Sequence, residues 1–265
     1  MYINSNSMAT QVSNNLTSHY SDLQTSTSRL SSGLRINSAA DDAAGLAIRE
    51  LMRTDIAALQ QGVRNANDAI SLIQTADGAL GIIDEKLTRM KELAEQAATG
   101  TYDSTQRLMI ESEYQAMASE ITRIANATDF NGIHLLNGNL SSDTHNGSAM
   151  SSTGKLKVHF GTANDSAEDY YYIKIGTSTA SALGVGNQAV GTDGLTVSTQ
   201  EAAQKALVAI TNAVVSKDKI RAHLGALQNR LENTISNLST QAENLQAAES
   251  RISDVDVATE MTKFV

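Results

Sequence analysis

The sequence has no cysteine, no proline and no tryptophan among its 265 residues. Without cysteine it can form no disulfide, no thiolate nucleophile and no cysteine-ligated zinc or iron–sulfur site. Without proline its helices can run without the breaks that this residue imposes on the backbone hydrogen-bond ladder. Aromatic residues make up only 4% of the chain, so a core has to be built from alanine, leucine, isoleucine and valine. These absences favour long helices and exclude thiol chemistry.

Positive charge is also scarce, with 20 lysines and arginines against 29 aspartates and glutamates and a net charge of -9. This balance opposes binding to nucleic acid and to anionic membrane surfaces. No stretch approaches the roughly 18 consecutive apolar residues of a membrane span. The segment from Met1 to Tyr20 lacks the basic start and apolar stretch of a secretory signal peptide, so export would use a route without one. We therefore expect no nucleic-acid partner and no membrane partner.

Apolar residues recur every seven positions near both ends of the chain, which is typical of a coiled-coil seam. Gly33 is expected to end the first helix and Gly100 to end a second, longer one. Capping boxes at Asp103 with Gln106 and at Ser198 with Glu201 predict two further helix starts. The terminal seams consist of Ala9, Leu16, Leu23 and Leu30, and of Leu224, Leu231, Leu238, Leu245 and Ile252; the middle helix carries Leu59, Ala66, Ile73, Leu80, Leu87 and Ala94.

Between residues 129 and 199 the helical pattern gives way to turn formers and to alternation of apolar and polar residues. Residues 156–160 and 171–175 alternate in this way and predict a β-hairpin with a long connection. Because a polar helix with a narrow apolar stripe needs a partner, the terminal heptads are expected to pack side by side, which makes the two chain ends neighbours. The predicted fold is mainly α, a long antiparallel helical bundle or coiled coil with a small β-hairpin region in the middle of the chain.

The sequence contains no recognisable catalytic, metal-binding or cofactor-binding motif. The 5 histidines are scattered, and neither H-E-x-x-H nor G-x-S-x-G occurs. Gly184, Gly186 and Ala189 match a dinucleotide fingerprint only in letters, without the strand and helix that it requires. The acidic pairs 41–42 and 254 with 256 are interpreted as helix-end carboxylates. We expect no enzyme and no cofactor; self-association and a monomeric bundle both stay open.

Several segments resemble the bacterial flagellins. The longest is Arg29–Ile48, with the sequence RLSSGLRINSAADDAAGLAI, and a second lies at residues 243–256, ENLQAAESRISDVD. Shorter matches are RNAND at 64–68, QTADGAL at 74–80, MKELA at 90–94 and DFNG at 129–132. The resemblance covers nearly the whole chain except the region from about Leu140 to Thr199.

The resemblance implies a structural subunit of the flagellar filament, located outside the cell and exported through the flagellar type III channel. Expected partners are other flagellin subunits, the cap and hook-junction proteins and an export chaperone. The implied organisation is a core helix and linker at 1–40, the first part of a helical outer-core domain at 41–139, a variable segment with the hairpin at 140–199, the outer-core C-terminal helix at 200–253 and the start of a core segment at 254–265.

The resemblance also implies recognition by an innate immune receptor of the Toll-like class. The matching positions are Arg89, Leu93 and Gln96 on one helical face, and Glu113 on the next helix. At Met117 the chain departs from the family, in which an arginine commonly follows the glutamate by one helical turn. This departure bears on receptor potency.

The second departure lies at the C-terminus, because flagellins continue with a further apolar-striped helix whereas this sequence stops at residues 261–265, MTKFV. That helix would pair with the seam from Ala9 to Leu30, so we expect the N-terminal segment to be loose in solution and native filament growth from this sequence unaided to fail. The segments usually bound by the export chaperone and by a cytosolic immune sensor would be lost with it. The alternatives are a hook–filament junction protein and an exported helical adhesin or effector.

Overall fold

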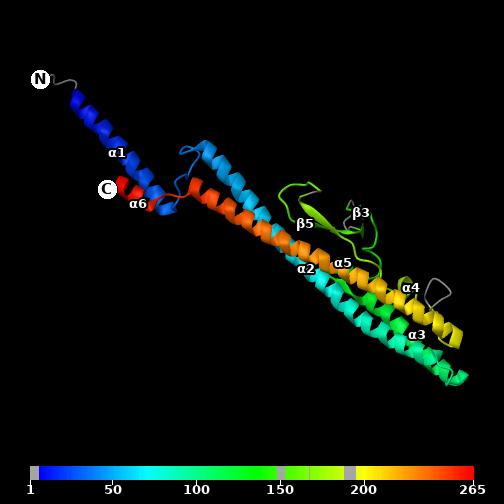
Figure 1. The fold of residues 1–265 in the computed structure, drawn as a ribbon. Helices are drawn as coiled ribbons and strands as arrows, with labels where there is room; N and C mark the ends of the chain where they lie inside the picture. Colours follow the sequence, from blue (N-terminus) through cyan, green and yellow to red (C-terminus); the bar gives the residue numbers. More distant parts are fainter. Residues whose placement is uncertain (1–5, 148–152, 167, 188–194) are drawn as a thin grey trace. The chain divides into compact units, whose positions relative to one another are not determined.

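A computed structural model describes residues 6–147, 153–166, 168–187 and 195–265. It confirms a mainly helical fold with short antiparallel strands in the middle (Figure 1). The helices are α1 (Ser7–Ser32), α2 (Ala43–Ala98), α3 (Ser104–Ala127), α4 (Ala180–Leu183), α5 (Gln200–Ser253) and α6 (Val257–Phe264). The strands are β1 (Asp129–Phe130), β2 (Ile133–His134), β3 (His145–Asn146), β4 (Thr153–Gly154), β5 (Leu156–His159) and β6 (Tyr170–Ile173).

The chain forms two compact units. The central unit comprises residues 61–237, and the terminal unit comprises residues 1–60 with 238–265. Helices α2 and α5 each contribute one part to each unit.

The central unit is a helical bundle whose core follows the predicted heptad. Leu80 and Leu87 of α2 are fully buried, as are Tyr114 and Ile121 of α3. The central part of α5 runs antiparallel to α2, because Lys217 is paired with Asp84 and Arg221 with Asp77. The other buried heptad positions of α2 in this unit are Ala66, Ile73 and Ala94. Burial of this stripe supplies the hydrophobic stabilisation of the bundle.

Lys217 of α5 is buried against α2, and only 2% of its side chain is exposed. Burial alone would lower its pKa, but hydrogen bonds to Asp218 and Asp84 raise the pKa above its usual value. The ammonium group therefore stays charged between α2 and α5. The Arg221 guanidinium beside Asp77 correspondingly holds the pKa of that carboxyl below its usual range.

The helix ends match some of the predicted signals and correct others. The capping box of Asp103 and Gln106 is confirmed at the start of α3. Gly100 does not end α2 in a left-handed conformation; instead the Arg107 guanidinium donates hydrogen bonds to the carbonyls of residues 97 and 99. The cap of α5 is Thr199, whose hydroxyl accepts from the backbone of residue 202, so the predicted box at Ser198 is wrong by one residue.

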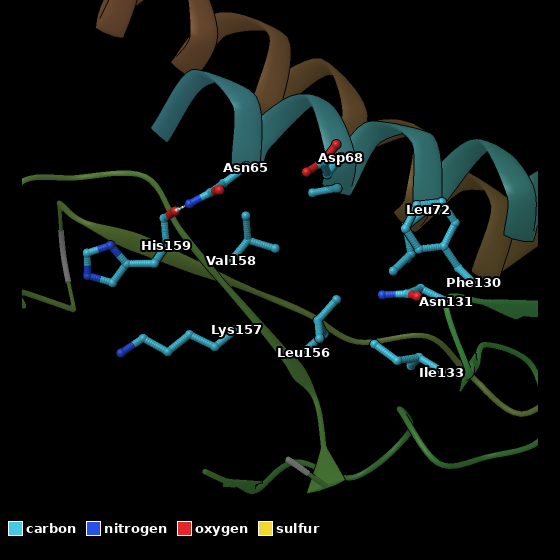
Figure 2. A pocket seen from close by; sticks show the side chains of 11 residues that line it. Asn65, Asp68, Leu72, Phe130, Asn131, Ile133, Leu156, Lys157, Val158 and His159 are labelled. Atoms are coloured by element: carbon cyan, nitrogen blue, oxygen red, sulfur yellow. Dashed lines mark hydrogen bonds between the residues drawn. The ribbon is translucent and has the colours of Figure 1, made fainter. Parts of the chain in front are cut away.

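The predicted hairpin is confirmed as β5 and β6, which pair antiparallel from Leu156 opposite Ile173 to His159 opposite Tyr170. It packs closely on α2 at Gly62, where an added methyl group would lie 2.0 Å from the carbonyl oxygen of Phe160. Nearby, the Asn65 side-chain amide donates a 2.8 Å hydrogen bond to the carbonyl of His159 (Figure 2). The missing side chain at position 62 thus lets two backbones touch.

In the terminal unit, α1 ends at Gly33 in the left-handed conformation, as predicted. The linker that follows pairs with the end of α5: Leu34 and Asp254 form an antiparallel bridge, and the Arg35 guanidinium donates to the carbonyl of Ile252. Helix α6 then runs back along α1 (Figure 1). The segments at the two chain ends are therefore neighbours, as predicted, but the predicted pairing of the two heptads is wrong. Helix α1 packs on α6, whereas Leu224 and Leu231 of the C-terminal heptad are buried in the central unit.

The acidic pairs act largely as the helix-end groups that the sequence suggested. Asp42 accepts from the backbone of Gly45 at the start of α2, and Asp256 caps α6 through Ala258 and Thr259. These bonds satisfy amide groups that have no partner inside the first helical turn.

Candidate interaction surfaces

Helix α1 carries an apolar stripe that stays exposed among the residues that the structure describes. Its members are spaced by three or four residues and so lie on one face of the helix. We call this surface the α1 stripe; it consists of Met8, Val12, Leu16, Tyr20 and Leu23, which are between 40% and 78% exposed. Helix α6 adds Val257, Met261 and Phe264, also exposed. Contiguous exposed apolar surface is typical of interaction sites.

Where α1 and α6 meet, the apolar side chains line a groove of about 340 Å³. Leu16, Tyr20 and Leu23 come from α1, and Phe264 and Val265 from the end of the chain. His19, Asp22 and Lys263 supply its polar rim. The stripe and the groove form one continuous surface of the terminal unit.

The predicted seam residues divide into two groups. Near the N-terminus Ala9, Leu16 and Leu23 are exposed and Leu30 is half-buried. Near the C-terminus Leu224, Leu231 and Leu238 are buried, and Leu245 and Ile252 are half-buried. Leu224 and Leu231 belong to the core of the central unit, and Leu238 is buried in the terminal unit. The exposed apolar surface of the terminal helices is therefore mainly that of α1 and α6.

The four positions for which the resemblance implies receptor recognition lie around the contact between α2 and α3. The Arg89 guanidinium lies 2.8 Å from the Glu113 carboxylate and 2.9 Å from that of Glu92. Hydrogen bonds to Glu113 and Glu92 raise the pKa of Arg89. Leu93 is only 2% exposed. The Gln96 amide donates to the Tyr102 hydroxyl at 3.0 Å.

The structure thus brings Arg89 and Glu113 together at the surface and places Leu93 beneath them. Met117, one turn after Glu113, is half-buried. The sequence pattern missed Glu92 and Tyr102 as neighbours of this group, although Glu92 stands three residues after Arg89 and so on an adjacent helical position.

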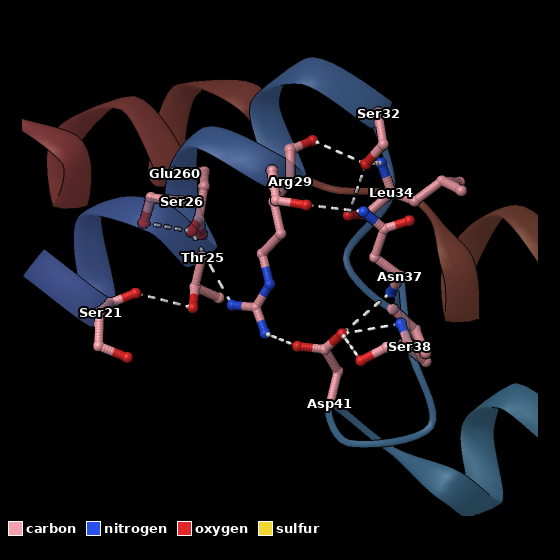
Figure 3. A network of polar contacts seen from close by, with 12 residues as sticks. Ser21, Thr25, Ser26, Arg29, Ser32, Leu34, Asn37, Ser38, Asp41 and Glu260 are labelled. Carbon is pink, nitrogen blue, oxygen red and sulfur yellow. Dashed lines mark hydrogen bonds and ion pairs between the residues drawn. The ribbon is translucent and has the colours of Figure 1, made fainter.

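A polar network joins α1, the linker after it and α6 (Figure 3). The Ser26 hydroxyl donates a 2.8 Å hydrogen bond to Glu260, whose side chain is only 4% exposed. Arg29 lies between Glu260, at 3.9 Å, and Asp41, at 3.3 Å. Hydrogen bonds from Ser38 and Asn37 hold the pKa of Asp41 below its usual value, and the Ser26 hydroxyl does the same for Glu260.

The central unit has a cavity of about 350 Å³ between α2, β5 and the β1–β2 turn (Figure 2). Leu72, Phe130, Ile133 and Leu156 give it largely apolar walls. Among the described residues, no group of three histidines or acidic residues is arranged to hold a metal ion. Within the same residues, no helix has the length and apolar character needed to cross a bilayer.

These features define a class of protein: a mainly helical chain whose terminal helices expose apolar side chains. Residues 3–141 match the bacterial flagellin N-terminal helical region, and residues 207–265 match the bacterial flagellin C-terminal helical region. The chain belongs to the bacterial flagellin family. Flagellins are structural proteins of the flagellar filament and not enzymes, so this chain is a filament subunit.

Two similar proteins and one solved structure agree with this assignment. The flagellin of Bacillus subtilis is 42% identical over 282 aligned residues, covering 100% of this chain and 90% of the relative. The flagellar filament 33 kDa core protein of Treponema phagedenis is 40% identical, with 100% of this chain and 90% of the relative covered. The crystal structure of Bacillus cereus flagellin is similar over 70% of this chain and 94% of that chain, with 28% identity and a TM-score of 0.51.

Proposed function

We propose that this flagellin joins the filament through the α1 stripe together with the exposed face of α6. The single observation that carries the proposal is the stripe itself, in which five large apolar side chains of α1 are exposed on one face. Burial of such side chains contributes about 25 cal/mol for each Å² removed from water. The rest of α1 is rich in serine, threonine and asparagine, which keeps the helix soluble before assembly.

The same surface is expected to bind the cap protein, the hook-junction proteins and the export chaperone. Cap and hook-junction proteins meet the subunits at the two ends of a filament, and the α1 stripe offers them the contact that it offers another subunit. An export chaperone would cover exposed apolar residues of the terminal unit before secretion.

Co-assembly tests the role of the stripe. We expect the double substitution Leu16→Ser with Leu23→Ser to lower incorporation into growing Bacillus subtilis flagellin filaments by at least roughly tenfold, because ~1.4 kcal/mol of lost contact energy has that effect. Labelled chain is mixed with an excess of Bacillus subtilis flagellin on sheared filament seeds, and the labelled fraction in the pellet is measured.

The matched control changes two residues on the opposite face of α1, Asn14→Ser with Ser21→Ala, and is expected to incorporate like the unmodified chain. Equal incorporation of the stripe variant and this control would count against the stripe as a contact surface. Failure of the unmodified chain to incorporate would count against the filament proposal as a whole.

We also propose that the Arg89–Glu113 surface is recognised by a Toll-like receptor of the host. Two observations support this role: the paired side chains come from adjacent helices and are 48% and 43% exposed, and Gln96 is exposed one to two turns further along α2. Leu93 supports the surface from below, since it is buried. Arginine is among the residues that most often dominate binding energy at interfaces.

Receptor-reporter cells test this second function. We expect Arg89→Ala to reduce potency by roughly tenfold or more, which corresponds to a loss of ~1.4 kcal/mol. Arg123→Ala is the matched control, because Arg123 also forms an exposed ion pair, with Glu120 of the same helix. Equal potency of the two variants would contradict recognition at Arg89.

A further inference from the structure

Glu260 occupies a position on α6 where an apolar residue would be expected. It lies three residues after Val257 and four before Phe264, on the side of the helix that faces α1. Its carboxylate accepts from Ser26 at 2.8 Å and from Lys263 at 3.2 Å. Only 4% of the side chain is exposed, so the carboxylate has lost most of its contact with water.

The positive side of the network is Arg29, which is held between two carboxylates. Its guanidinium lies 3.3 Å from Asp41 and 3.9 Å from Glu260. Asp41 is fixed in turn by backbone hydrogen bonds from Asn37 and Ser38, at 3.2 and 2.9 Å. The linker after α1 therefore holds the arginine in place, and the arginine holds Glu260 (Figure 3).

Such a network is a poor source of stability. Taking an ion pair out of water is unfavourable for both ions, and replacing a buried pair with apolar side chains of similar volume is often neutral or stabilising. A buried polar group does, however, discriminate between alternative alignments of two helices, as a single buried asparagine does in coiled coils.

The residues of α1 one turn before and after Ser26 disfavour any other alignment of α6. Helix α6 runs antiparallel to α1, and Glu260 stands opposite Ser26. A shift of α6 by one helical turn would place Glu260 beside Asp22, a like charge, or beside Leu30, which offers no hydrogen bond. Apolar contacts alone would not oppose such a shift, because the exposed residues of both helices repeat at about the same interval.

We propose that Glu260 is a positioning residue that sets the alignment of α6 on α1, and thereby the shape of the surface through which subunits associate. The proposal rests on the assembly function proposed above. In the aligned state Phe264 lies with Leu16 and Leu23 around the groove of the terminal unit. Misalignment by one turn, about 5.4 Å, would separate these side chains.

A distance measurement between spin labels tests the alignment directly. Because the chain has no cysteine, Ser18→Cys on α1 and Thr262→Cys on α6 provide the only labelling sites. The sequence alone predicted a loose N-terminal segment, but in the structure α1 packs on α6. Pulsed electron paramagnetic resonance of this double-cysteine chain is therefore expected to give one narrow distance distribution. With Glu260→Leu added, we expect the helices to stay associated but to give two or more distances, separated by about one helical turn.

Two outcomes overturn the proposal. A single unshifted distance in Glu260→Leu shows that the carboxylate does not set the alignment. A broad distribution at long distances shows that α6 has left α1, so that Glu260 contributes stability and not alignment. The control Thr259→Ser, at the preceding and exposed position outside the apolar face of α6, keeps the hydroxyl group and is expected to leave the distance unchanged.

The same variants, tested in co-assembly with Bacillus subtilis flagellin, separate this inference from the assembly function. We expect Glu260→Leu to incorporate at least roughly tenfold less than Thr259→Ser. Equal incorporation of the two, despite altered distances, would break the link between alignment and assembly and overturn that part of the proposal. If even the chain without these substitutions does not incorporate, the assembly function fails while the distances still decide the alignment.

Discussion

Gly62→Ala is expected to destabilise the central unit by about 3 kcal/mol and to lift the β5–β6 hairpin from α2. The added methyl carbon would lie 2.0 Å from the Phe160 carbonyl oxygen and 2.9 Å from its Cα, and a backbone cannot yield as a side chain does. Overpacking of this kind typically costs 1–3 kcal/mol, occasionally more. Denaturant unfolding gives the change in free energy, and hydrogen exchange at the hairpin amides reports the displacement.

The matched control is Gly78→Ala on the same helix, where an added methyl group meets nothing within 4 Å. Alanine is the better helix former, so this control is expected to stabilise the protein by roughly 0.5–1 kcal/mol. The two substitutions make the same chemical change with opposite expected signs. Stabilisation in both would mean that the hairpin does not rest on α2 at residue 62.

Leu87→Ala is expected to destabilise the central unit by about 3–5 kcal/mol, because Leu87 is fully buried between the helices and its loss leaves a cavity. For a chain of this size each kcal/mol lowers the melting temperature by roughly 2–4 °C, so a fall of about 6–20 °C should be visible by circular dichroism.

Ile82→Ala provides the comparison, since Ile82 lies five residues earlier on the same helix and is 49% exposed. Its expected effect is below about 1 kcal/mol, because the removed groups are already largely in water. Similar melting temperatures for the two variants would contradict the bundle described for the central unit.

The heptad spacing predicted the helices but not their partners. Leu16 and Leu231 occupy the same kind of position in the sequence, yet one is exposed and the other is buried in the core. Spacing shows which residues share a face, whereas burial depends on what the rest of the chain brings against that face. The alternation at residues 156–160 was enough to predict the hairpin, because a period of two occurs in strands and not in helices.

The contacts that join distant parts of the sequence could not be predicted. Ser26 and Glu260 are separated by 234 residues, and nothing in the sequence around either one indicates the hydrogen bond between them. The one available signal was an acidic residue on the apolar face of a short helix. The close approach at Gly62 was likewise hidden, because a glycine inside a helical pattern does not reveal which backbone approaches it.

Local signals failed where two groups competed for the same role. Gly100 was expected to end α2, but Arg107 satisfies the final carbonyls from the next helix, which removes the need for a left-handed glycine. At the start of α5, Ser198 and Thr199 are both good capping residues, and the structure uses the threonine.

The central claim of this account is that the exposed face of α1 is the surface by which one subunit joins another. Co-assembly on filament seeds tests it most directly. The test compares two double variants of α1: one carries both Leu16→Ser and Leu23→Ser, and the other carries both Asn14→Ser and Ser21→Ala. The account predicts that the first variant stays in the supernatant while the second is found in the pellet with the unmodified chain. Equal pelleting of both variants would contradict it.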